Sequence, residues 1–220
     1  MSFEPREIHE DPATFHARPF HDAGRALWVP VLTSTPTLVL GNHQPDSDVD
    51  TDKLRSEGIE LTTRRSGGGA VLVSAGDVIW FDVVIPASDP LWDPDVGRSF
   101  DWLGHACQRA LSNLGVATDL HSGRLVQNEW SRKICFSSLG PGELTRDGRK
   151  LVGMSQRRTR DAARIQVAIL RRWDGPRHAA FLRLDADDRA RAALDLDDVA
   201  VGIPHSPTDV LRAIFAELPS

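Results

Sequence analysis

The sequence predicts an α+β fold, with a mixed and mainly antiparallel sheet flanked by helices. Short apolar or alternating segments typical of strands recur between residues 37 and 170, one segment among them has helical periodicity, and the chain ends in a helix signature. With 220 residues, of which 40% are hydrophobic, the chain can form one globular unit with a substantial core. We therefore expect residues 1–220 to be a single domain.

The charge balance argues against a broad basic surface. Asp and Glu total 31 against 26 Lys and Arg, a formal net charge of −5, so no nucleic-acid partner is expected. The two cysteines form no CxxC pair, and neither a signal peptide nor an uncharged apolar run of about 18 residues stands out. These features favour a cytoplasmic protein that does not enter a membrane.

The first half of the chain predicts short elements separated by turns. Pro30 and Gly58 each end a predicted helix, and Ala75-Gly-Asp77 supplies a turn between two apolar strands. In chain order we expect an arm over 1–20 with one short helical turn, a helix over 21–29, a strand over 37–41, a helix over 49–57, a strand over 59–64, and a hairpin of strands over 70–73 and 78–85 in the core sheet.

The second half predicts the major helix and the last strands of the sheet. Apolar residues at three- and four-residue spacing predict a helix between Asp95 and Leu114, and Asp147-Gly148 is a strong hairpin turn. Ser206-Pro207 begins a C-terminal helix as its cap and first residue. Strands are expected over 117–121, 133–136, 143–145, 150–157 and, half-buried, 163–170.

The segment from Arg64 to Val71, RRSGGGAV, carries the strongest indication of a binding site. Successive glycine amides can converge on one anion, and two guanidiniums can add charge and paired hydrogen bonds to a phosphate or carboxylate. From composition alone, a flexible hairpin connection with solvated arginines is the favoured explanation of the same residues. The segment lacks the Gly-Lys-Ser/Thr ending of a P-loop, and no helix pattern follows it as in a dinucleotide fingerprint.

Lys150, one of three lysines, and Cys135 are the candidate reactive side chains. Lys150 follows the hairpin turn on an apolar strand whose opposite face carries Gly153, where another group could approach the backbone. Cys135 precedes a Gly/Pro loop, which leaves its exposure open, whereas Cys107 lies on the apolar stripe of a helix. A surface lysine and a buried structural cysteine are the alternatives. The eight histidines show no metal-binding motif, so no protein-held metal is expected.

Five segments occur in a recognisable order along the chain. They are Leu38-Val-Leu-Gly41-Asn-His-Gln44, Arg64-Arg-Ser-Gly-Gly-Gly-Ala-Val71, Cys135-Phe136, Gly140-Pro-Gly-Glu143 and Asp147-Gly-Arg-Lys150-Leu-Val-Gly153-Met-Ser-Gln156. Together they resemble the lipoate-protein ligase A family, within the biotin/lipoate ligase superfamily of catalytic domains. The resemblance covers roughly residues 25–172, and it implies a catalytic core over 25–185 followed by a short helical tail over 186–220.

The resemblance implies a tunnel for a lipoyl or octanoyl chain, and a reaction in which ATP and magnesium activate the acid to an acyl-adenylate. The acyl group then passes to a lysine of a lipoyl carrier domain, in a 2-oxoacid dehydrogenase complex or the glycine-cleavage carrier protein. Lys150 would reach the acyl carbonyl and the α-phosphate, and would be essential for transfer but dispensable for folding. The residues implied to bind the adenylate are Arg64, Arg65, Ser66, Gly67, Gly68, Gly69, Ala70 and Gly153.

Three departures from the family pattern keep other functions open. Val73 stands where many relatives have a histidine, Ile165-Gln166 where many have His-Gly, and 47 residues follow Trp173 where several ligases have an accessory domain. A sister group of octanoyltransferases and lipoyl-amidotransferases carries a nucleophilic cysteine near the position of Cys135. The ligase is our first hypothesis. Thioester transfer through Cys135 from an acyl carrier protein, without ATP, is the second, and a non-catalytic protein that binds an acyl or adenylate ligand is the third.

Overall fold

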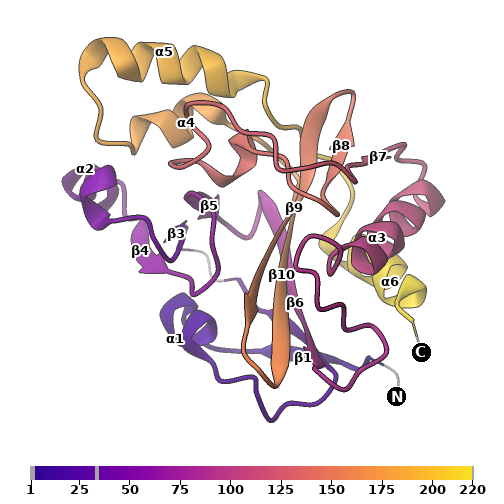
Figure 1. The fold of residues 1–220 in the computed structure, drawn as a ribbon. Coiled ribbons are helices and arrows are strands. Elements are labelled where there is room, and N and C mark those ends of the chain that lie inside the picture. Colours follow the sequence, from indigo (N-terminus) through magenta and orange to yellow (C-terminus); the bar gives the residue numbers. More distant parts are fainter. Residues whose placement is uncertain (1–2, 33–34, 220) are drawn as a thin grey trace.

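The computed structural model describes residues 3–32 and 35–219, which form two sheets surrounded by helices (Figure 1). In spatial order the larger sheet consists of β1 (Pro5–Ile8), β2 (Ala26–Pro30), β6 (Val78–Pro86), β10 (Ala162–Leu170), β9 (Arg149–Arg158), β8 (Leu144–Arg146) and β7 (Asp119–Leu120). The smaller sheet consists of β4 (Glu60–Thr63), β3 (Thr37–Leu40) and β5 (Val71–Val73). The pairs β1–β2 and β3–β4 are parallel and the other pairs antiparallel, so the predicted mixed, mainly antiparallel α+β class is confirmed.

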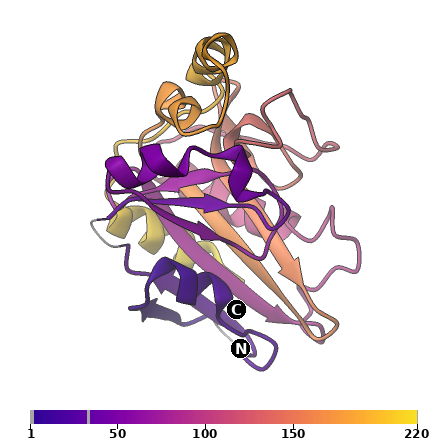
Figure 2. The same cartoon turned by 90° about the vertical axis from the view of Figure 1, so that its left-hand side faces the viewer.

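Helices cover the ends and flanks of the sheets. They are α1 (Pro12–Ala17), α2 (Thr51–Ser56), α3 (Asp101–Asn113), α4 (Gly175–Ala180), α5 (Ala186–Asp197) and α6 (Pro207–Glu217), with short 3-10 turns η1 (Asp46–Asp48) and η2 (Cys135–Ser137). Helices α3 and α6 pack together, as do α4 and α5, and the α4–α5 pair lies at the opposite end of the molecule from α1 (Figures 1 and 2). Ser206 caps α6 by accepting a hydrogen bond from the Asp209 amide, as predicted.

Three predicted elements are wrong because tertiary pairing overrides the local pattern. Residues 21–29 were expected to be helical, but β2 occupies their second half and pairs with both β1 and β6. The strands over 70–73 and 78–85 form no hairpin, because β5 pairs with β3 and β6 pairs with β2 and β10. Residues 133–136 form no strand, because Ile134 makes only an isolated bridge with Ala70 and the 3-10 turn η2 begins at Cys135.

The structure also differs from the predictions in where some helices and strands begin and in how deeply one strand is buried. The predicted arm over 1–20 contains the described strand β1 as well as the helical turn of α1, and α3 begins at Asp101 although its apolar spacing starts near Asp95. Strand β10 is buried along its whole length, not half-buried, because β6 and β9 pair on either side and other elements cover both faces. Helix α4 has no counterpart among the predicted elements.

Two hydrophobic cores meet beside η2. The larger core contains the seven-stranded sheet with residues of α1, α3 and α6 and some of the three-stranded sheet. The smaller core lies between the three-stranded sheet and helices α2, α4 and α5. Ile134 belongs to the smaller core and Phe136 to the larger one, so Cys135 lies where they join. We therefore look for the active site at this junction of the two cores.

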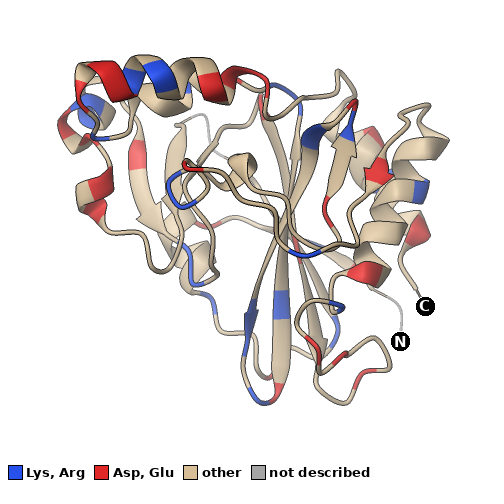
Figure 3. Cartoon of the chain, turned by 45° about the horizontal axis from the view of Figure 1, so that its top comes forward, with Lys and Arg blue, Asp and Glu red and all other residues tan. Residues whose placement is uncertain are grey.

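The surface of the described chain mixes charges of both signs, for example along α5 (Figure 3). No helix within residues 3–32 and 35–219 combines the length and the apolar character that a membrane crossing requires.

A buried polar layer connects α1 to the large sheet. Arg164 on β10 forms an ion pair with Asp82 on β6 and donates to the carbonyls of Phe15 and Arg18 at 2.9 and 3.2 Å. His16 packs edge-on against Trp80, and its Nδ1 lies 3.1 Å from the amide nitrogen of Gln166. Burial, with the Arg164 and Arg64 charges adding to it, lowers the pKa of His16 to about 3.

We predict that His16 makes the protein less stable as the pH falls. Between pH 6.5 and 3 the unfolded chain binds a proton at this histidine that the folded protein excludes, so the free energy of unfolding decreases through that window. From pH 7 to pH 5 the loss due to His16 is about 2 kcal/mol. Urea unfolding of the wild type and His16→Gln across this range should show a flatter pH profile for the variant. Equal profiles would contradict a neutral buried His16.

Candidate active site

The Gly-rich loop over 64–70 is held against η2 by backbone contacts. Ala70 donates to the Lys133 carbonyl at 2.8 Å, and Cys135 donates to the Ala70 carbonyl at 2.9 Å. A Cβ atom on Gly69 would lie 2.5 Å from the Ile134 nitrogen, so only glycine permits this approach. The loop is therefore an ordered wall of the site, not a flexible connection.

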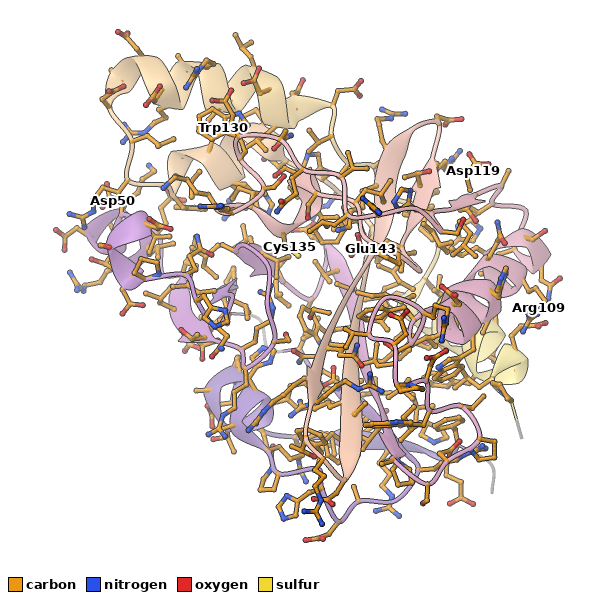
Figure 4. All side chains as sticks on the ribbon, viewed as in Figure 1. Asp50, Arg109, Asp119, Trp130, Cys135 and Glu143 are labelled. Carbon is orange, nitrogen blue, oxygen red and sulfur yellow. The ribbon has the colours of Figure 1, made fainter. Side chains whose placement is uncertain are left out.

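Cys135 lies beside this loop. It is near the middle of the molecule and close to Glu143 (Figure 4). Its thiol is partly exposed, whereas Cys107 on α3 is fully buried. Gly68 crosses directly above the sulfur with φ at 96°, and a Cβ atom there would lie 3.4 Å from Sγ. A side chain at Gly68 would thus both strain the backbone and cover the thiol.

Arg64 holds the Gly-rich loop by hydrogen bonds and places a positive charge near the Cys135 thiol. Its guanidinium is 1% exposed and donates to the carbonyls of Val39, Gly67 and Gly69 at 3.2, 2.6 and 2.9 Å. Its Nη2 atom lies 3.9 Å from Cys135 Sγ. Burial lowers the pKa of Arg64, and the nearby sulfur acts in the opposite direction.

Lys150 is buried in an ion pair instead of pointing into open space. Its Nζ lies 2.7 Å from Glu143 Oε2, and the two side chains are 3% and 5% exposed. The ammonium also donates to the carbonyls of Ser138 at 2.9 Å and Cys135 at 3.3 Å, and it lies 5.1 Å from the centre of the Phe136 ring. Through these hydrogen bonds Lys150 stabilises the η2 turn that carries Cys135.

Glu143 is the residue of this site to which sequence reasoning gave no role. It accepts hydrogen bonds from the backbone amides of Gly140 and Met154 at 2.7 and 2.8 Å, besides pairing with Lys150. The sequence does indicate that Glu143 lies near Lys150. The hairpin turn at Asp147-Gly148 pairs the segment that follows Glu143 with the segment that contains Lys150.

The other predicted residues divide into buried and exposed groups. Ser66 is buried and its hydroxyl contacts Gln166 Oε1 at 2.7 Å and Ser155 Oγ at 2.9 Å, whereas Arg65 and Gly67 are exposed. Gly153 does not lie opposite Lys150 as predicted. A Cβ atom there would lie 3.3 Å from Lys150 Cε and 3.1 Å from the Phe136 ring, so aromatic and lysine side chains occupy the space that its hydrogen leaves.

Cys135 opens into a cleft of about 500 Å³. The cleft is bounded by the Gly-rich loop, the segment before α3, the loop over 125–131, the loop over 138–143 and β9. Its apolar lining residues include Val96, Phe100, Leu125, Pro141 and Met154. A second groove of about 490 Å³ adjoins it on the other side of Gly68 and is lined by His43, Gln44 and Arg132 among others.

The site thus combines a partly exposed thiol, a buried guanidinium beside it and an apolar cleft. Thiolates are the nucleophilic form of cysteine, and a nearby cation favours negative charge on sulfur. Within the described residues, no group of three or more His, Cys, Asp or Glu side chains is placed to hold a metal ion. The structure brings Arg64, Ser66 to Ala70, Cys135 and Lys150 together, and it leaves Arg65 on the outside.

Comparison with known proteins identifies relatives of the whole fold. The family model described as the lipoyl protein ligase A/B catalytic domain matches residues 20–200. The octanoyltransferase LipM of Kyrpidia tusciae is 32% identical over 200 residues, which cover 83% of this chain and 71% of that protein. The LipM of Moorella thermoacetica is 30% identical over 156 residues, covering 70% of this chain and 56% of the relative. The chain spans about half the length of this relative and of the LipM of Clostridioides difficile.

Solved structures share the fold at low sequence identity. A bi-partite lipoate protein ligase from Thermoplasma acidophilum superimposes with a TM-score of 0.75 at 20% identity, covering 99% of this chain and 82% of that chain. A lipoate-protein ligase A bound with ATP gives a TM-score of 0.64 at 21% identity, covering 98% and 83%. The predicted biotin/lipoate ligase-like fold is confirmed by these similarities.

We predict that Lys150 is important for stability, contrary to our expectation from the sequence. Lys150→Ala should lower the free energy of unfolding by about 3 to 5 kcal/mol, because it leaves the Glu143 carboxylate buried without its cation. Adding Glu143→Gln should restore part of that loss, as measured by urea unfolding of the double variant.

Lys133→Ala is the matched control for this change. Its ion pair with Asp48 is partly exposed at 29% and 26%, so its loss should cost about 1 kcal/mol or less. Equal losses in Lys150→Ala and Lys133→Ala, or strict additivity of the Lys150 and Glu143 changes, would contradict a buried, coupled pair.

Proposed function

The chain belongs to the lipoyl protein ligase A/B catalytic domain family, and we propose that it transfers an octanoyl or lipoyl group through a thioester on Cys135. The observation that carries the proposal is the partly exposed Cys135 thiol in the cleft, with Arg64 Nη2 3.9 Å from its sulfur. The similarity to LipM octanoyltransferases supports the same reaction class. We also propose that residues 1–220 act as one catalytic domain.

The reaction that this arrangement supports has two steps. The Cys135 thiolate attacks the carbonyl of an acyl thioester, the bond from that carbonyl to the donor sulfur breaks, and the donor leaves as a thiolate that solvent protonates. A neutral lysine amine of the acceptor then attacks the Cys135 thioester. An amide forms, the amine proton is lost to solvent, and the Cys135 thiolate is released. Arg64 offsets negative charge on the sulfur at the start and at the end.

The buried cations Arg64 and Lys150 already interact with protein groups, which favours a thioester donor over ATP. The two Nη atoms of Arg64 donate to carbonyls of β3 and of the loop, and Lys150 is paired with Glu143, so both groups predicted to bind phosphate already have protein partners. Arg64 Nε alone has none among the described residues. Among the described residues the exposed Arg65 is the loop cation that faces outward. Adenylate formation from lipoate or octanoate with ATP and magnesium is the alternative that the test below separates.

We propose partners by the chemistry of the two steps. The donor is an acyl thioester on a pantetheine arm, as on an acyl carrier protein, and the acceptor is an exposed lysine of a small lipoyl carrier domain. The apolar rim of the cleft at Val96 and Leu125, each more than half exposed, lies where a protein carrying either group would approach Cys135. No nucleic-acid or membrane partner is proposed.

We predict a covalent acyl adduct on Cys135. After mixing with octanoyl-pantetheine, intact-protein mass spectrometry should show one octanoyl group that hydroxylamine removes, and Cys135→Ala should show none. Cys107 is an internal control, because burial raises its pKa to about 12 and leaves it unreactive. Transfer that needs ATP, proceeds from free octanoate and persists in Cys135→Ala would establish the ligase alternative instead. Ligand binding without transfer in either assay would establish the non-catalytic one.

We predict that the charge of Arg64 sets the reactivity of this cysteine. Arg64→Gln keeps a polar side chain with one NH2 donor but removes the cation next to Sγ, so iodoacetamide alkylation and octanoyl adduct formation should both slow about 10- to 100-fold. Arg65→Gln is the matched control, because that side chain is exposed and should leave both rates near the wild-type values. Equal effects of the two substitutions would contradict a direct role for Arg64.

A further inference from the structure

Three cavities adjoin one another through shared lining residues, and the first of them contains Cys135. The open cleft comes first, and beneath it lies an interior void of about 10 Å³ that shares Cys135, Met154 and Ser155 with the cleft. Trp80 lines this void and also a third, largely apolar cavity of about 30 Å³ near α1. The void has room for one water molecule at most, so a bound acyl chain must displace a side chain to enter it.

The floor of the void is a row of small residues that ends at a large one. Gly153 on β9 pairs with Ala168 on β10, and Ala168 pairs with Trp80 on β6, so the three lie side by side across the sheet. Cross-strand neighbours share one face of a sheet. A glycine and an alanine therefore leave a narrow trench below Cys135, which the Phe136 ring and the Lys150 side chain largely cover above Gly153. Trp80 closes its far end.

Trp80 is held in place on several sides. The Trp80 indole donates to Asp82 Oδ1 at 2.7 Å, Asp82 is ion-paired with Arg164, and His16 packs edge-on against the ring. Trp80 is therefore fixed as the end wall of the trench.

We propose, on the basis of the proposed function, that Trp80 limits the length of the acyl chain carried on Cys135. The chain enters from Cys135, lies over Gly153 and Ala168, and stops against the Trp80 ring. Removing the ring joins the trench to the cavity near α1, whose lining includes Phe15, Val39 and Val73. Longer saturated acyl chains are the substrate class that this added apolar space accommodates.

The test is a competition among acyl chain lengths. Wild-type protein and variants are incubated with an equimolar mixture of hexanoyl- to tetradecanoyl-pantetheine, and adducts on Cys135 are quantified by intact-protein mass spectrometry. Trp80→Ala should raise the ratio of dodecanoyl to octanoyl adduct at least tenfold, since each buried methylene adds about fourfold in affinity. Ala168→Leu fills the trench and should shift the distribution towards hexanoyl. Trp80→Leu gives the same direction of change as Trp80→Ala and covers the case in which that variant does not fold.

Trp130→Ala is the matched control, because Trp130 is also buried and donates from Nε1 to a carboxylate, that of Asp195, away from the trench. Its chain-length distribution should equal that of the wild type. An octanoyl adduct in every protein with an unchanged distribution in the Trp80 and Ala168 variants would overturn the Trp80 inference and leave the proposed function intact. Absence of any adduct, in the wild type as well, would overturn the proposed function and this inference with it.

Discussion

The backbone pairing of Ala70 with residues 133–135 is the contact on which the rest of the site depends. It joins the Gly-rich loop to the turn that carries Cys135, and it requires the close approach that Gly69 permits. When these two segments are fixed, Gly68 and the Arg64 guanidinium both lie next to the Cys135 sulfur. A shift of either segment would separate the thiol from its cation, so the reactivity of the site follows from backbone geometry.

The two buried cations have different roles in this arrangement. A buried charge is tolerated when it is compensated by partners. Arg64 is compensated by three carbonyls, which carry no net charge, and it therefore keeps a positive field that reaches Sγ. Lys150 is compensated by the Glu143 carboxylate, so its charge is largely cancelled at the thiol and its hydrogen bonds to Cys135 and Ser138 hold the turn in place.

Much of this fold could be predicted from the sequence, because periodicity and turn residues report local structure. The β8–β9 hairpin and the α6 cap follow from such residues and are confirmed, with Asp147 and Gly148 both at positive φ. The strand β2 and the separation of β5 from β6 could not be predicted, since they depend on pairing partners distant in the chain. For the same reason the sequence located Lys150 and Cys135 but could not show that Glu143 neutralises one and Arg64 faces the other.

The polar row beside the trench explains how loop and sheet act as one unit. Ser155, Gln166 and Asp82 pair across β9, β10 and β6, next to the row of Gly153, Ala168 and Trp80. Gln166 accepts a hydrogen bond from Ser66 of the Gly-rich loop and donates to Asp82, which also holds the Trp80 indole. The loop above Cys135 and the wall below it are thus connected through the same carboxylate. A change that loosens Asp82 would therefore disturb the loop, the trench and the α1 contact of Arg164 together, which is why the polar layer must stay fully hydrogen-bonded inside an otherwise apolar core.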